Sequence, residues 1–91
     1  MPEIPSLPQG MSLSHFGRKV MVWGTGNEAA EARIKTLTIQ QLRDAGITVE
    51  MAQSWTDFYR QVLLVTPNNP SAMGRARLME YAVSLFKEVS R

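Results

Sequence analysis

Apolar residues recur at helical spacing along this chain, most clearly between residues 48 and 66. In this stretch they fall at intervals of three and four, which gives a helix one wide apolar face. Its apolar members are Met51, Ala52, Trp55, Phe58, Tyr59, Val62 and Leu63. Three of these seven are aromatic and carry large areas to bury. The pattern therefore predicts a long central helix on which the core condenses.

A less regular stretch, residues 12–23, fits a helix with Ser12 as its N-terminal cap. Residues 19–23 (Lys-Val-Met-Val-Trp) would equally make a short strand, and Gly17 weakens a helix. We favour the helix because no neighbouring segment offers a partner strand.

Three threonines at capping positions predict the following helix starts. Thr25 with a glutamate three residues later opens a helix that continues to Leu37, and Thr38 with Gln41 opens a short helix that ends at Gly46. Thr48 then caps the central helix.

The last element is predicted to start at Asn69 as cap, with Pro70 as the first helical residue. Residues 71–89 carry a broad apolar stripe, so this helix should pack on two neighbours. Residues 1–11 contain three prolines and are expected to form an extended arm or linker. The sequence thus predicts an all-α domain over residues 12–91, a compact bundle of four or five short helices.

Composition narrows the class of protein without specifying a reaction. The chain has 91 residues, 44% hydrophobic and 20% charged, which is typical of one globular domain. It has no cysteine, so disulfides and thiolate metal sites are excluded, and its apolar runs are too short to cross a bilayer. The N-terminus lacks the pattern of a secretory signal. A net charge of +2 permits binding to nucleic acid without requiring it.

The turn Gly24-Thr25-Gly26 precedes a predicted helix start, where backbone N–H groups can cradle an anion. Arg33 is close enough in sequence to add positive charge. The residues of a phosphate-binding P-loop are missing, and a tight turn with a capped helix explains the same pattern. The single histidine, His15, has no second ligand nearby, so no metal site is expected.

Residues 42–55 are similar to a helix-hairpin-helix pattern, in which a glycine turn presents N–H groups to a nucleic-acid phosphate. Thr48 stands where that family has its second glycine, and Asp44 and Glu50 add negative charge. Two capped helices joined by a tight turn account for these residues more simply.

Four segments of the chain resemble one small, functionally uncharacterised helical domain found at the C-terminal ends of bacterial Rhs-type and related polymorphic toxins. They are residues 16–26, 55–60, 68–70 and 75–79, and the single residues Ala30 and Arg33 match as well. The most specific segment is Lys-Val-Met-Val-Trp-Gly-Thr-Gly at residues 19–26. The resemblance spans residues 16–86.

This resemblance implies an effector or toxin-type domain of a bacterial interference system, made in the cytoplasm and delivered into a target cell by a secretion system. Its expected substrate is nucleic acid or another phosphate-bearing molecule, with no cofactor. Its expected partners are an immunity protein or a larger toxin carrier. The alternative is a non-catalytic helical module that binds a protein or nucleic acid. A third option is self-association through Leu78 and Leu85.

If the domain is catalytic, the segments that carry the resemblance point to one polar pocket. We expect Lys19, Asp57 and Tyr59 to be catalytic, with Asp57 as a base or metal ligand. Gly24, Thr25, Gly26 and Arg33 would bind the anion. Asp57 and Arg60 would equally form an ordinary ion pair along one helix face.

Overall fold

The computed structural model describes residues 4–89, which form α-helices and one π-helical turn. The elements in chain order are α1 (Leu13–His15), η1 (Phe16–Val20), α2 (Glu28–Ile34), α3 (Ile39–Asp44), α4 (Val49–Val65) and α5 (Ala72–Val89). No strand occurs in this part of the chain. The predicted all-α bundle is therefore confirmed.

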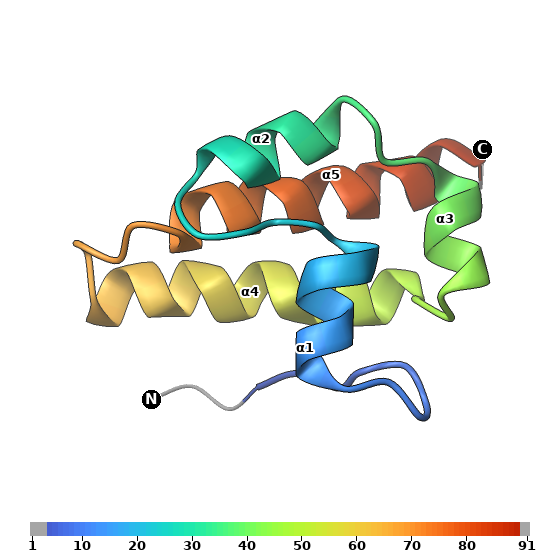
Figure 1. Cartoon of the computed structure of the whole chain (residues 1–91), viewed down its shortest axis with the longest axis horizontal. Coiled ribbons are helices and arrows are strands. Elements are labelled where there is room, and N and C mark those ends of the chain that lie inside the picture. Colours follow the sequence, from blue (N-terminus) through green and yellow to red (C-terminus); the bar gives the residue numbers. More distant parts are fainter. Residues whose placement is uncertain (1–3, 90–91) are drawn as a thin grey trace.

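Two long antiparallel helices, α4 and α5, lie side by side and organise the bundle (Figure 1). The short helix α2 packs on α5, and α3 closes the end of the bundle near the C-terminal part of α5 (Figure 1). The prediction that the last helix packs on two neighbours is confirmed for α4 and α2, and α5 contacts α3 as well. None of the helices in residues 4–89 is both long and apolar enough to cross a membrane.

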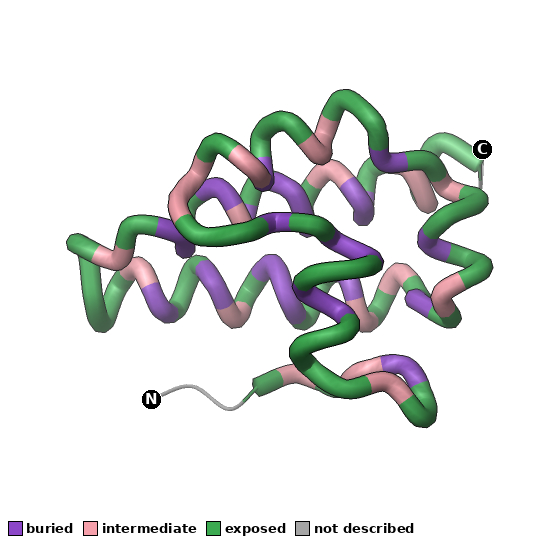
Figure 2. Tube along the Cα trace, viewed as in Figure 1, coloured by how far each residue is buried: buried purple, intermediate pink, exposed green. Residues whose placement is uncertain are grey.

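The core is built around aromatic rings of α4, as the sequence predicts. Trp55 is 1% exposed and stacks on Phe16 of η1, with ring centroids 5.0 Å apart. Tyr59 and Trp23 form a T-shaped pair with ring centroids 5.3 Å apart. Each such pair contributes about 0.5–1.5 kcal/mol beyond its area burial. Buried positions lie on the sides of α4 and α5 that face each other (Figure 2).

The helix expected over residues 12–23 ends at Val20, and its second part, η1, is a π-helix rather than an α-helix. Regular α-helix ends at His15, and η1 closes with the Met21 N–H donating to the Phe16 carbonyl oxygen at 2.9 Å. Met21 and Trp23 are both buried, so the chain turns at Val22, which takes a φ of +50°. Burial of these two flanking side chains explains why the helix does not continue to Trp23.

The start of α2 also differs from the prediction. Its N-terminal cap position is Asn27, and no side-chain hydrogen bond caps the helix there. Thr25 therefore does not cap it. The Asn27 side chain instead accepts a hydrogen bond from the Gly74 N–H of α5, at 2.9 Å. The helix ends at Ile34 rather than continuing to Leu37, and the Leu37 side chain is buried in the core.

The caps of α3 and α4 are as predicted. The Thr38 hydroxyl accepts from the Gln41 N–H at 3.2 Å, and the Gln41 side chain accepts from the Thr38 N–H at 3.0 Å. This is a complete capping box. The Thr48 hydroxyl accepts from the Met51 N–H at 3.2 Å and opens α4.

Gly46 ends α3 in a Schellman motif. It has a φ of +82°, its N–H donates to the Arg43 carbonyl oxygen, and the Ile47 N–H donates to the Leu42 carbonyl oxygen at 3.0 Å. Both amides are therefore already bonded within the chain. The simpler interpretation of two capped helices accounts for this turn.

The cap chemistry predicted for the last helix is present, although regular helix begins at Ala72 rather than Pro70. The Asn69 side-chain oxygen accepts from the N–H groups of Ser71 and Ala72, each at 2.9 Å. Leu78 of α5 is fully buried. It therefore offers no surface for the self-association that the sequence left open.

The proline-rich arm packs on the bundle from Ile4 onward. Pro8 is buried, Leu7 packs against the core, and the Trp55 indole N–H donates to the Ser6 carbonyl oxygen at 3.3 Å. Residues 1–3 of the predicted arm lie outside the described residues. Between Ile4 and Met11, the arm contacts the core through Leu7, Met11 and the Ser6 carbonyl group.

Candidate functional site

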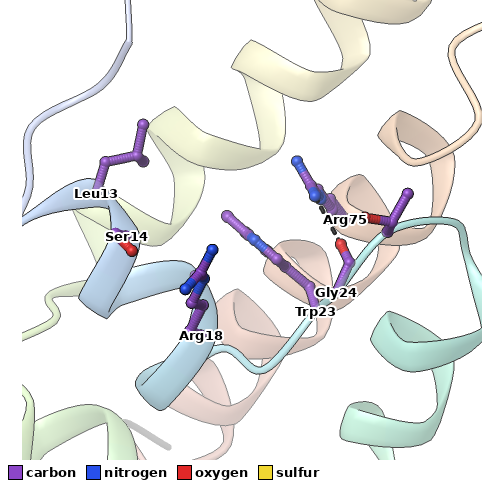
Figure 3. Close-up of a pocket in the computed structure, with 8 residues that line it drawn as sticks. Leu13, Ser14, Arg18, Trp23, Gly24 and Arg75 are labelled. Atoms are coloured by element: carbon purple, nitrogen blue, oxygen red, sulfur yellow. Dashed lines mark hydrogen bonds between the residues drawn. The ribbon is translucent and has the colours of Figure 1, made fainter.

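A hollow of about 380 Å³ lies between the α1–η1 turn and the N-terminal part of α5 (Figure 3). Its lining residues are Leu13, Ser14, Gly17, Arg18, Trp23, Gly24, Thr25 and Arg75. Two of these are arginines, and none is acidic. Figure 3 shows Arg18 and Arg75 on opposite sides of Trp23. The hollow is therefore a basic site with an aromatic floor.

Arg75 is held in place by α5 and by three groups around its guanidinium. One Nη donates to the Gly24 carbonyl oxygen at 2.6 Å, and the other donates to the Tyr59 hydroxyl at 3.4 Å. The guanidinium carbon lies 4.9 Å from the Trp23 ring centroid, which is cation–π distance. Two hydrogen bonds leave part of its five-donor fork unused. Arg75 is thus a fixed charge with donor capacity to spare.

Arg18 supplies the second charge of the hollow and is exposed on η1. Within residues 4–89, no carboxylate lies within ion-pair distance of either Arg18 or Arg75. The ion pairs that do form there join Arg60 to Glu80 and Arg77 to Glu31. The alternative of an Asp57–Arg60 ion pair along α4, which the sequence left open, is therefore not realised, because Arg60 pairs with Glu80 of α5.

Tyr59 remains protonated at neutral pH. Its burial raises the pKa of the phenol above the usual 10.0, and the hydrogen bond and charge of Arg75 oppose this only in part. A phenol with a raised pKa does not act as a general base near pH 7. The geometry instead gives Tyr59 the role of holding Arg75.

One N–H group of the glycine turn is already bonded within the chain. The Gly26 N–H donates to the Ser71 hydroxyl at 2.8 Å, so it is occupied, and the Gly24 carbonyl oxygen faces Arg75. Gly24 and Thr25 nevertheless line the hollow. The turn therefore belongs to the site as a wall, while the arginines supply its donors.

The structure does not bring the other predicted residues into this hollow. The Arg33 guanidinium donates to the Val20 carbonyl oxygen at 2.8 Å and so fastens η1 to α2. Asp57 accepts from the Gln53 side chain at 3.0 Å and lines a different hollow beside the N-terminal arm. Lys19 is exposed on η1. The single pocket expected from these residues is not formed.

Residues 1–86 match the family described as Domain of unknown function (DUF4951). The chain belongs to this family. The chain is also similar to a solved structure described as the NMR structure of the protein from Acinetobacter baumannii. The sequences are 35% identical, and the match covers 93% of this chain and 82% of that chain with a TM-score of 0.80. No curated protein matches the chain.

The expected membership in a helical family of unknown function is thus confirmed. The link to Rhs-type toxins finds no support in these matches and stays a prediction.

The most informative residue of this DUF4951 domain, Arg75, is not among the site residues predicted from the sequence. The spacing between Arg75 and the apolar residues that follow it is the sequence pattern that indicates its inward position. Leu78, Met79 and Ala82 follow it at spacings of three, four and seven, and all three are fully buried. A charged residue in register with a buried stripe must find polar partners inside.

Other chemistry is sparse in the DUF4951 fold. His15 is exposed at the end of α1, and its backbone N–H bonds the Ser12 hydroxyl. Residues 4–89 contain no group of three or more histidine, cysteine or acidic side chains placed to hold a metal. The basic hollow is therefore the site from which a function is best argued.

Proposed function

We propose that this domain is a binding module for an oxyanion, a phosphate or carboxylate group of a partner molecule, and that Arg18 and Arg75 bind it. The observation that carries the proposal is that both arginines line one hollow without an acidic partner among residues 4–89. Arginine forks match the geometry of carboxylate and phosphate oxygens, and charge-assisted hydrogen bonds are the strong ones.

The two arginines would act differently. Arg75 is oriented before the ligand arrives, by Gly24, Tyr59 and Trp23, so little side-chain entropy is lost when it binds. Arg18 is exposed and closes on the anion from the other side of the hollow. The lining includes no carboxylate and no histidine, which favours binding over acid–base catalysis.

Titration with inorganic phosphate at low salt tests this proposal by isothermal calorimetry. We expect Arg18→Gln to weaken binding about tenfold, the loss of one charge-assisted hydrogen bond. Arg75→Lys should weaken it by a similar factor because it keeps the charge and loses the fork. Arg43→Gln, the same charge change on α3, is the control and should leave affinity unchanged. Equal losses in the Arg18 and Arg43 variants would contradict the proposal.

The effector role is a second proposal, and it rests on the resemblance of residues 19–26 to toxin-associated domains. Growth of bacteria that express the chain in the cytoplasm tests it, with Lys19→Ala and Asp57→Ala variants alongside. If the parent arrests growth and the folded variants do not, the effector role and these two residues are supported. Equal growth of bacteria that express the parent and the two variants would contradict the effector role.

A further inference from the structure

A second hollow of about 200 Å³ adjoins the basic one, along α4. Its lining residues are Ile4, Leu13, Trp55, Phe58, Tyr59, Val62, Asn69 and Arg75. Leu13 and Arg75 line both hollows, so the two are neighbours that share part of their walls. A ligand group bound beside Arg75 therefore has an apolar neighbour within reach.

The size of the apolar hollow limits what it can hold. An apolar cavity of about 150 Å³ is sufficient for benzene, so this hollow suits one leucine- or phenylalanine-sized side chain. A long acyl chain would extend beyond it. Leu13 and Ile4 at its rim are 44% and 57% exposed, so contact with an apolar group would remove their surfaces from water.

One polar group at this hollow has unused hydrogen-bonding capacity. The Asn69 side-chain oxygen caps α5, which orients the amide, while its nitrogen donates to no group within residues 4–89. A side-chain amide nitrogen carries two donors. A peptide carbonyl oxygen can accept from it, whereas the methylene groups of an acyl chain cannot.

Aromatic stacking with a nucleic-acid base does not fit the same place. Trp23 is 5% exposed, and its ring packs against Phe16, Tyr59 and the Arg75 guanidinium. Binding of single-stranded nucleic acid depends on open aromatic faces. The aromatic floor of the basic hollow is already occupied by the protein itself.

We infer that the two hollows together bind the carboxyl-terminal residue of a partner polypeptide, when that residue has an apolar side chain. The carboxylate would lie between Arg18 and Arg75, and the side chain would enter the apolar hollow. Both groups branch from one Cα atom, so neighbouring hollows suit them. This inference rests on the proposed oxyanion site and names the partner that site takes.

Three peptides test the inference, each six residues long and built from glycine and serine up to its last residue. The first ends in leucine with a free carboxylate, the second is its C-terminal amide, and the third ends in glycine with a free carboxylate. We expect the first to bind at least about tenfold more tightly than either of the others, by fluorescence anisotropy of an N-terminal label.

Two variants assign the parts of the ligand to the two hollows. Leu13→Gln should erase most of the preference for leucine over glycine, while Arg18→Gln should erase the preference for acid over amide. Both positions are exposed, so folding should be preserved. Leu64→Gln is the matched control, because Leu64 is 76% exposed on α4 and lines neither hollow.

The outcomes separate this inference from the proposed function. If inorganic phosphate binds in an Arg18-dependent way but the leucine and glycine peptides bind equally, the oxyanion site stands and the inference is overturned. If octanoate binds more tightly than the leucine peptide, the site takes free amphiphiles and the inference is again overturned. If neither phosphate nor any free carboxylate binds, both fail together.

Discussion

Arg75 and Tyr59 hold each other in place at the edge of the core. The Arg75 guanidinium lies 5.7 Å from the Tyr59 ring centroid and donates to its hydroxyl. The Arg75 Nε is buried and has no partner within the described residues. Leaving a buried donor unpaired costs about 1–3 kcal/mol, so α5 tolerates a local penalty to place this charge. The penalty is consistent with a binding role for Arg75.

Tyr59 makes the protein sensitive to alkaline pH. Its raised pKa means that, above the unfolded value of 10.0, the unfolded chain loses the phenol proton while the folded chain keeps it. The free energy of unfolding should therefore fall as pH rises from about 10 toward the folded pKa, and be unaffected by this group below that. Urea denaturation of Tyr59→Phe from about pH 8 to 11 should show a shallower decline than the parent. Tyr81→Phe is the control and should follow the parent.

Val22 stores backbone strain beside the site. A β-branched residue at φ +50° is a true outlier, and such positions cost on the order of 1–3 kcal/mol. Its neighbours Met21 and Trp23 are both buried, which forces this conformation on it. The strained backbone at Val22 allows the Trp23 ring to lie against the Arg75 guanidinium.

Relief of that strain is measurable. Val22→Gly should raise the free energy of unfolding by about 1 kcal/mol, the strain removed minus the greater entropy of the unfolded chain. Val22→Ala keeps a Cβ atom and should gain less. Thermal denaturation compares the two, and a loss of stability in the glycine variant would show that Val22 is not strained.

At the scale of elements, side chains close in sequence decide where helices begin. Thr38 and Thr48 cap because the amide that each must reach lies three residues ahead. Thr25 has the same spacing to Glu28, yet α2 starts from Asn27 without a side-chain cap. The difference arises because Gly26 is hydrogen-bonded to Ser71, the residue before α5, and Asn27 is hydrogen-bonded to Gly74 of α5.

Replacing each of the three threonines with alanine compares two positions that cap a helix with one that does not. Thr48→Ala and Thr38→Ala should each lower the free energy of unfolding by about 1 kcal/mol. Thr25→Ala, at an exposed position without a cap bond, should change it by less than about 0.5 kcal/mol. Chemical denaturation of the three proteins checks the order, and a Thr25 effect as large as that of Thr48 would restore the predicted capping box.

At the scale of the molecule, the loop before α2 is seated on the N-terminal turns of α5. A Cβ atom added at Gly74 would lie 2.8 Å from the Asn27 backbone. Glycine at this helical position is therefore required by a contact between segments far apart in the chain. This contact also places Gly24 against Arg75.

Gly74→Ala is therefore expected to destabilise the domain, which is the opposite of the usual effect of replacing a helical glycine with alanine. Alanine in place of glycine inside a helix normally stabilises by about 0.5–1 kcal/mol. Here overpacking should instead lower the free energy of unfolding by about 1–3 kcal/mol. Thermal denaturation measures it, and a stabilised variant would mean that the loop is not seated as described.

Features that depend on residues close in sequence could be predicted from the sequence, whereas features that depend on contacts between distant segments could not. The caps at Thr38 and Thr48 and the apolar face of α4 are local patterns, and they were predicted correctly. The expected pocket failed because Asp57 and Tyr59, two apart on α4, point to opposite sides of a helix. The basic hollow joins η1 to α5, and no local pattern brings Arg18 and Arg75 together.

Nuclear magnetic resonance of the parent protein during a phosphate titration tests the central claim most directly. The Trp23 indole N–H and the backbone amides of Arg18 and Thr25 should shift together and saturate. The shifts should be lost in Arg18→Gln and retained in Arg43→Gln. Shifts spread over the whole surface, or identical in the two variants, would contradict the claim that this hollow binds an oxyanion.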